Sequence, residues 1–184
     1  MRVITGSARG KPLKELPGMD TRPTTARVKE GLFSAIQFDI EGRQVLDLFA
    51  GTGQLGIEAL SRGAAHCDFV DASSAAMKIV RDNVRACRLS ERAAFYQEDF
   101  AAFLQRAKGK QYGLVFLDPP YASGNLERAL TLLAGVDIVA GNGIIICESP
   151  AQCLMPAMPE PYRWGREYRY GQIKLTLCHR SVSS

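Results

Sequence analysis

The chain has 184 residues, of which 46% are hydrophobic and 23% charged, a composition typical of one globular domain with a sizeable core. It contains no apolar run long enough to span a bilayer, and its first residues lack the apolar segment of a secretory signal. The five cysteines form no CxxC pair, which argues against a metal site or a disulfide framework. We therefore expect buried free thiols in a cytoplasmic protein.

The net charge of +4 is distributed unevenly. Residues 1–29 hold seven basic and two acidic side chains, residues 30–159 eleven basic and fifteen acidic, and residues 160–184 five basic and two acidic. Basic ends around an acidic middle favour a phosphate-binding surface at the two ends. An ordinary solvated surface explains the same charges equally well.

The first 40 residues form an element of their own. Residues 2–4 and 12–16 are expected to pair as a small hairpin across Gly6 and Gly10. A helix over residues 26–37, capped by Thr24 or Thr25, follows. Its inward face is expected to consist of Val28, Leu32, Phe33 and Ile36. Because this stretch is too short for a domain, we expect it to pack as an extension on a domain formed by residues 41–184.

Strands and helices then alternate. The expected strands are residues 44–49, 67–70, 93–97, 114–117 and 143–147, and the expected helices are residues 55–62, 74–88, 100–107 and 126–134. Ser73 is the expected N-cap of the second of these helices, with Ala76, Ile79, Val80 and Val84 on one face. Since the strands are apolar throughout, the pattern predicts a mainly parallel sheet covered on both faces.

The end of the chain departs from this alternation. Residues 163–170 and 172–178 flank Gly171 with no helix between them, which predicts an antiparallel hairpin added to the sheet edge. Residues 150–161 contain four prolines and are expected to form a loop. The fold class expected is α/β, with a seven-stranded, mostly parallel sheet.

A glycine-rich motif follows the first of these strands. Gly51, Gly53 and Gly56 match G-x-G-x-x-G between a strand and a helix, where glycines allow a tight turn and close approach to a ligand. Asp71 ends the next strand, in position to bind a ribose hydroxyl. These features alone fit a nicotinamide dinucleotide equally well.

Two further acids favour a different ligand. Asp47 lies inside the strand, where it would repel a pyrophosphate and attract an ammonium and a sulfonium group. Asp99, after Glu98, follows the third strand and could accept a hydrogen bond from an adenine amino group. Acids at the ends of three strands thus indicate a cationic nucleoside such as S-adenosylmethionine. The alternative for Asp47 is a carboxylate that only stabilises the turn.

The second motif is Asp118-Pro119-Pro120-Tyr121 at the end of an apolar strand. The prolines fix the backbone and leave carbonyl groups available as acceptors. Asp118 and an adjacent carbonyl can bind the two N–H groups of an aromatic amine and direct its lone pair at a methyl donor. Tyr121 offers a flat face for a flipped-out base. The alternative is a simple turn with a half-buried tyrosine.

Together these two motifs resemble a class I Rossmann-like methyltransferase that methylates amino groups. Residues 2–6, 9–11, 21–33 and 55–64 further resemble the RsmD family, and the similarity covers nearly the whole chain. The resemblance implies N2-methylation of one guanine in 16S ribosomal RNA, on an assembled small subunit or a late precursor. We expect a monomer with no membrane partner.

The resemblance also implies a role for each matching residue. The cofactor would be bound by Asp47, Phe49, Gly51, Gly53, Asp71, Asp99 and Asp118. The guanine would be held by Asp118, Pro119, Pro120 and Tyr121, while Arg9, Lys11, Lys14, Arg22, Pro23 and Thr24 would face the RNA or border the active site. No metal ligand is expected. Many relatives carry Glu in place of Asp71, and residues 148–161 are hard to align and receive no role.

Rival functions differ in specific features. A DNA adenine-N6 methyltransferase usually has a sizeable target-recognition segment, for which the chain has no room. A protein glutamine-N5 methyltransferase typically has Asn in place of Asp118. A non-catalytic RNA-binding assembly factor of the same fold has no need of an intact cofactor motif. A dehydrogenase leaves Asp47 and Asp118 unexplained.

Overall fold

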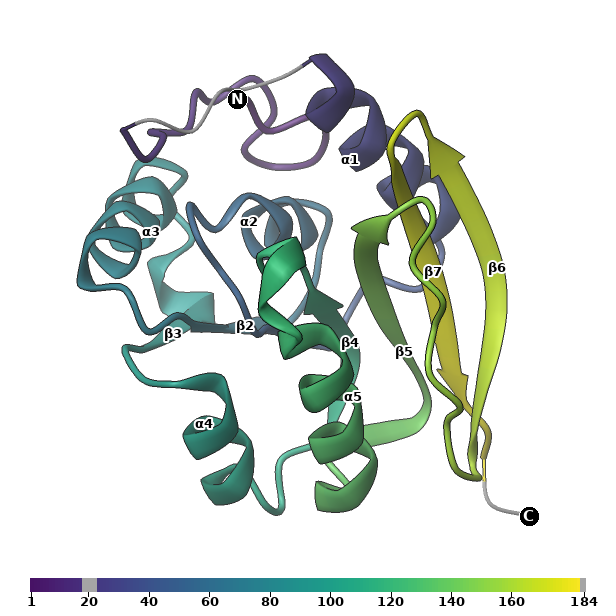
Figure 1. Cartoon of the computed structure of the whole chain (residues 1–184). Helices are drawn as coiled ribbons and strands as arrows, with labels where there is room; N and C mark the ends of the chain where they lie inside the picture. Colours follow the sequence, from purple (N-terminus) through teal and green to yellow (C-terminus); the bar gives the residue numbers. More distant parts are fainter. Residues whose placement is uncertain (18–22, 183–184) are drawn as a thin grey trace.

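The computed structural model describes residues 1–17 and 23–182 (Figure 1). Its helices are α1 (Pro23–Ala35), α2 (Gln54–Ser61), α3 (Ser74–Ala86), α4 (Phe100–Arg106) and α5 (Asn125–Val136). Its strands are β1 (Gln44–Asp47), β2 (His66–Val70), β3 (Ala93–Tyr96), β4 (Tyr112–Leu117), β5 (Val139–Pro150), β6 (Tyr162–Tyr170) and β7 (Ile173–Arg180). All the strands expected in the alternating region and in the terminal hairpin are present, and β5 is longer at both ends than expected.

The seven strands form one sheet in the order β3-β2-β1-β4-β5-β7-β6. The first five are parallel to their neighbours, and the β6–β7 hairpin is antiparallel, with β7 paired to β5. This confirms the predicted fold class. The terminal hairpin supplies one edge of the sheet, and β3 supplies the other.

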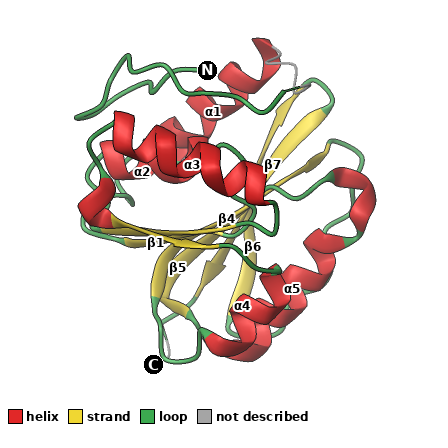
Figure 2. Cartoon of the chain, turned by 90° about the vertical axis from the view of Figure 1, so that its left-hand side faces the viewer, coloured by secondary structure: helices red, strands yellow, loops and turns green. Residues whose placement is uncertain are grey.

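Helices cover both faces of the sheet, with α1, α2 and α3 on one side and α4 and α5 on the other (Figure 2). Each central strand is buried on both sides. Val45 and Leu114 belong to the first apolar layer, whereas their neighbours Leu46 and Val115 belong to the second. Burial on both faces explains why apolar residues follow one another in these strands instead of alternating with polar ones.

The N-terminal segment is held to α2 by polar contacts more than by strand pairing. Among the described residues, the expected hairpin is reduced to one antiparallel bridge between Arg2 and Pro12. The buried Glu58 of α2 accepts hydrogen bonds from the backbone N–H groups of Ile4 (2.8 Å) and Thr5 (3.0 Å). Lys29 of α1 is only 2% exposed and lies 3.1 Å from the same carboxylate. Segment, α1 and α2 are thereby joined through one buried ionic group.

Two local expectations are wrong. Helix α1 begins at Pro23, so Thr24 and Thr25 lie inside its first turn and neither is the cap. Proline suits this first position because its missing N–H would have no helical partner there. In α3, Ser73 caps the helix as expected, by accepting from the N–H of Ala76. Ile79, however, is partly exposed, and Met77 is buried in the core instead of Ile79.

Helix α1 otherwise follows its predicted pattern, since Val28, Leu32, Phe33 and Ile36 are all buried. All five cysteines are free, as expected, and only Cys153 is partly exposed. None of the helices in the described part of the chain is long and apolar enough to cross a membrane. Residues 1–17 and 23–182 also contain no cluster of His, Cys, Asp or Glu suited to a metal ion.

Candidate active site

A cavity of about 570 Å³ opens at the carboxyl ends of β1 and β4. These two strands are adjacent and parallel, but the chain leaves them in opposite directions across the sheet. The helices that follow them, α2 and α5, therefore cover opposite faces of the sheet (Figure 2), and the cavity lies at this reversal of strand order. Ligands of open α/β sheets bind at such a reversal of strand order, and the volume suits a small-molecule site.

The three glycines of the turn have separate tasks. Gly51 (φ +54°) lines the cavity, and a Cβ there would meet no atom within 4 Å, so its backbone is open to a ligand. Gly53 (φ +79°) does not line the cavity, and a Cβ there would lie 2.4 Å from Val80. At Gly56 an added Cβ would lie 2.4 Å from the ring of Phe69. The second and third glycines thus permit close packing of α2.

The position of Asp47 is compatible with both roles considered for it. Its side chain is 2% exposed and lines the cavity, and its Oδ2 accepts a hydrogen bond from the N–H of Gly56 at 3.0 Å. Burial raises the pKa of the Asp47 carboxyl to about 7, with a smaller contribution from the charge of Asp71. A cation in the cavity would therefore be matched by a carboxylate that the turn already orients.

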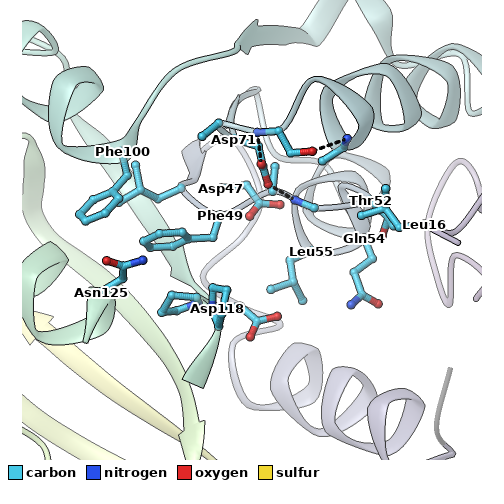
Figure 3. A pocket seen from close by; sticks show the side chains of 18 of the residues that line it. Leu16, Asp47, Phe49, Thr52, Gln54, Leu55, Asp71, Phe100, Asp118 and Asn125 are labelled. Atoms are coloured by element: carbon cyan, nitrogen blue, oxygen red, sulfur yellow. Dashed lines mark hydrogen bonds between the residues drawn. The ribbon is translucent and has the colours of Figure 1, made fainter. Parts of the chain in front are cut away.

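Backbone N–H groups also fix two more of the predicted cofactor acids. Asp71 accepts from the N–H of Gly51 (2.9 Å) and of Ser73 (2.8 Å), as Figure 3 shows. Asp99 caps α4 by accepting from the N–H of Ala101 at 2.9 Å through Oδ1. Both line the cavity, and each retains lone pairs for a ligand.

Phe49, the remaining predicted cofactor residue, forms an apolar wall of the cavity. Its ring packs against that of Phe100, with centroids 5.0 Å apart (Figure 3). Asn125 lines the same cavity. The wall suits an aromatic group of a ligand better than a charged one.

The charge of the lining is one-sided. Seven acidic residues line the cavity, and no Lys or Arg occurs among its described lining residues. These acids are Glu15, Asp47, Asp71, Glu98, Asp99, Asp118 and Glu148. A pyrophosphate would be repelled here, whereas a ligand with positive charge would be attracted.

Asp118 follows β4, and its carboxylate points into the cavity (Figure 3). Burial, and then the charges of Glu148 and Asp47, raise the pKa of the Asp118 carboxyl well above its ordinary value. Pro119 is buried beside it. The carbonyl of Pro120 already accepts from the N–H (3.2 Å) and the hydroxyl (2.6 Å) of Ser123. The carbonyl of Pro119 is therefore the better candidate for an acceptor that acts with Asp118.

Tyr121 begins a short 3-10 turn, Tyr121–Ser123, and its side chain is 49% exposed. Its hydroxyl donates a hydrogen bond to Oε1 of Glu148 at 2.7 Å. Burial and this hydrogen bond raise the pKa of the Tyr121 phenol, which stays protonated at neutral pH. The exposed ring at the cavity mouth is open to a stacked base.

Several lining residues have no role in the sequence analysis, and three of them bear on the chemistry of the cavity. Glu148 follows an apolar run in the sequence, as Asp71 does. The criterion that identified Asp71 could therefore also have identified Glu148. Gln54 lines the cavity, and its Oε1 is buried with no hydrogen-bond partner among the described residues. Leu16 brings the N-terminal segment over the cavity (Figure 3), and no sequence signal indicates this contact.

Arg9, Lys11 and Lys14, three of the predicted RNA-binding residues, lie apart from the cavity lining. Arg9 and Lys11 are exposed in the N-terminal segment. Lys14 is also exposed, and its Nζ lies 2.8 Å from Oδ2 of Asp82. Pro23 and Thr24 form the start of α1, and Arg22 lies outside the described residues.

Comparisons with known proteins agree with this geometry. The Escherichia coli ribosomal RNA small subunit methyltransferase D is 35% identical over 184 residues, covering 99% of this chain and 91% of that protein. YlbH of Bacillus subtilis, described provisionally as an rRNA methyltransferase, is 40% identical over 173 residues, covering 93% of this chain and 94% of that protein. A solved structure of Escherichia coli yhhF, described provisionally as a methyltransferase, matches with a TM-score of 0.86 at 32% identity, covering 100% of this chain and 99% of that chain.

This similarity in fold, together with an acid-lined cavity at the switch point, defines a class I methyltransferase, the class that uses S-adenosylmethionine. A family model described as "Conserved hypothetical protein 95" matches residues 1–179. The chain belongs to that family, which is the RsmD family of ribosomal RNA small subunit methyltransferases.

Proposed function

We propose that this protein transfers a methyl group from S-adenosylmethionine to the exocyclic N2 amine of one guanine in small-subunit (16S) ribosomal RNA. The observation that carries the proposal is the position of Asp118 and Tyr121, at the end of β4 and beside the acid-lined cavity. Family membership supports ribosomal RNA as the substrate. The chemistry of the site supports an amine as the acceptor.

The residues of the cavity fit the proposed donor. S-adenosylmethionine supplies an electrophilic methyl group on a sulfonium, and the C–S electron pair stays on sulfur when the amine lone pair forms the new N–C bond. Gly51 leaves open backbone for close approach, and Asp71 and Asp99 offer acceptors for ribose and adenine. Asp47 supplies a buried negative charge for the cationic end.

The acceptor side is formed by the motif at the end of β4. Asp118 and the Pro119 carbonyl accept the amine N–H groups, so that the nitrogen lone pair is withdrawn from the ring and aimed at the methyl group. Since a guanine amine is a weak nucleophile, positioning supplies most of the acceleration. The surplus proton leaves to water after transfer. Tyr121 holds the flipped-out base by stacking.

The experiment uses tritiated S-adenosylmethionine with small subunits, total RNA and DNA from a strain that lacks this gene. We expect label in small-subunit RNA as N2-methylguanine and none in DNA. Label in DNA as N6-methyladenine would contradict the proposal. Transfer to neither nucleic acid, with the donor shown to bind, would also contradict it and favour a protein substrate or a binding role. The enzyme is expected to act as a monomer in the cytoplasm, where small subunits mature.

One variant, measured in two ways, tests whether Asp118 serves the acceptor amine or the methyl donor. Asp118→Ala should abolish methylation and leave donor binding largely intact, because Asp118 contacts the acceptor amine. Isothermal titration with S-adenosylmethionine measures binding, and tritium transfer to small subunits measures activity. Equal loss of binding and transfer would show that Asp118 serves the donor instead.

A further inference from the structure

Glu148 lies beside Asp118 because of the register between β4 and β5. Leu117 is paired with Cys147, so the next residues along the two parallel strands, Asp118 and Glu148, are also neighbours. Adjacent strands are roughly 4.8 Å apart, and paired residues of parallel strands point to the same face. The two carboxylates therefore face the same space at the end of the sheet.

This space connects two cavities. The cavity described above and a second one, of about 320 Å³, share Pro119, Pro120, Tyr121 and Glu148 in their linings. The second cavity is otherwise lined by the start of α5 and by residues 149–150 and 153–156, the region that the sequence left without a role. Glu148 thus stands where an acceptor base must enter to reach Asp118.

One oxygen of Glu148 is fixed and the other is available. Oε1 accepts the hydrogen bond from the Tyr121 hydroxyl at 2.7 Å. Within the described part of the chain, Oε2 has no hydrogen-bond donor and Glu148 has no basic partner. Burial raises the pKa of Glu148, as it does that of Asp118. Two such acids side by side, with Oε2 of Glu148 unoccupied among the described residues, offer acceptors for N–H donors of a ligand.

Guanine brings two adjacent donors on its Watson–Crick edge, N1–H and the N2 amine. Adenine and cytosine have an unprotonated ring nitrogen, an acceptor, next to their amine, which an ionised carboxylate would repel. On the basis of the proposed function, we propose that Glu148 is the residue that selects guanine, by accepting N1–H through Oε2 while Asp118 accepts an N–H of the N2 amine. Tyr121 contributes by holding Glu148 in this orientation.

Glu148→Gln gives a sharp test because it keeps the size and shape of the side chain and changes only its hydrogen-bonding groups. With Oε1 accepting from the Tyr121 hydroxyl, as in the wild type, Nε2 replaces the acceptor Oε2 with a donor. The variant should methylate guanine roughly 100-fold more slowly, since a donor then faces N1–H. It should act better than the wild type on 2,6-diaminopurine, which keeps the N2 amine but has an acceptor at N1.

The substrates are small subunits reconstituted with guanine or with 2,6-diaminopurine at the target nucleotide, mapped first with the wild-type enzyme. Rates are measured by tritium transfer and corrected for donor occupancy by titration. Glu127→Gln is the matched control, because Glu127 lines the second cavity but is exposed and has no part in the proposal. It should change neither rate by more than about twofold, the effect of a surface substitution.

A reversal of base preference in Glu148→Gln supports the inference. Equal loss on both bases would overturn it and leave Glu148 as a support for Tyr121. Guanine methylation within a few-fold of the wild type would also overturn it, while leaving the proposed function intact. A wild-type enzyme that transfers no methyl group to guanine would instead refute the proposed function, and the inference with it.

Discussion

The charge of Asp47 depends on pH near neutrality. Its pKa is raised to about 7 by burial, so the side chain is partly protonated near that pH. A cationic ligand favours the ionised form and lowers this pKa in the complex. Affinity for S-adenosylmethionine should therefore fall as the pH is lowered through 7, and binding should release protons there.

Titration calorimetry from pH 6 to pH 8, in buffers with different ionisation enthalpies, measures both effects. Burial also raises the pKa values of Asp118 and Glu148, so protonation of these two acids lowers the affinity for the cation at low pH as well. Asp47→Asn is therefore the necessary comparison, because it removes only the part that belongs to Asp47. An affinity that is constant over this range in the wild type would contradict the assignment.

Among structural elements, the N-terminal segment and α1 depend on one buried ionic group. Glu58 is fully buried and is approached by Lys29 and by Arg62, whose Nε lies 2.9 Å from Oε1. Lys29→Met should lower the free energy of unfolding by about 3 kcal/mol, near the lower end for a broken buried pair because Arg62 remains. Urea denaturation measures the change. Lys78→Met, at an exposed position of α3, is the control and should stay within about 0.5 kcal/mol.

The alternating elements could be predicted because hydrophobic pattern and turn residues determine them locally. The N-terminal hairpin could be predicted only in part. The N–H groups of Val3 and Leu13 do bond across it, but those of Ile4, Thr5 and Ala8 are bound by Glu58 and Ser61 of α2, more than 50 residues away. Gly6 shows the same dependence, because a Cβ there would lie 1.8 Å from the Ser61 carbonyl. Such partners are known only once the chain is folded.

The residues of the candidate site likewise divide into those that the sequence identifies and those that only the folded sheet reveals. Asp47, Asp71, Asp99 and Asp118 were identifiable because each ends or follows an apolar strand. Glu148 also follows an apolar run, within β5, but its position beside Asp118 depends on the register between β4 and β5. Register is a property of the assembled sheet and cannot be read from either strand alone.

On the scale of the whole molecule, exposed basic residues determine how binding to RNA responds to salt. Arg9 and Lys11 are exposed, and we expect both to contact phosphates. Changing each to Ala should weaken binding to small subunits and reduce the slope of log K against log salt by roughly 0.7 to 0.9 per residue. Filter binding from 50 to 200 mM salt measures the slope. An unchanged slope would place the RNA surface elsewhere on the protein.

The N-terminal segment has one further consequence for the intact enzyme. It carries Arg9 and Lys11 on its surface, and a few residues later Glu15 and Leu16 form part of the cavity wall. One short, continuous stretch of chain is therefore shared by the two places where ligands are expected. Thermodynamic linkage is reciprocal. If the bound methyl donor raises the affinity for RNA by some factor, bound RNA raises the affinity for the methyl donor by the same factor.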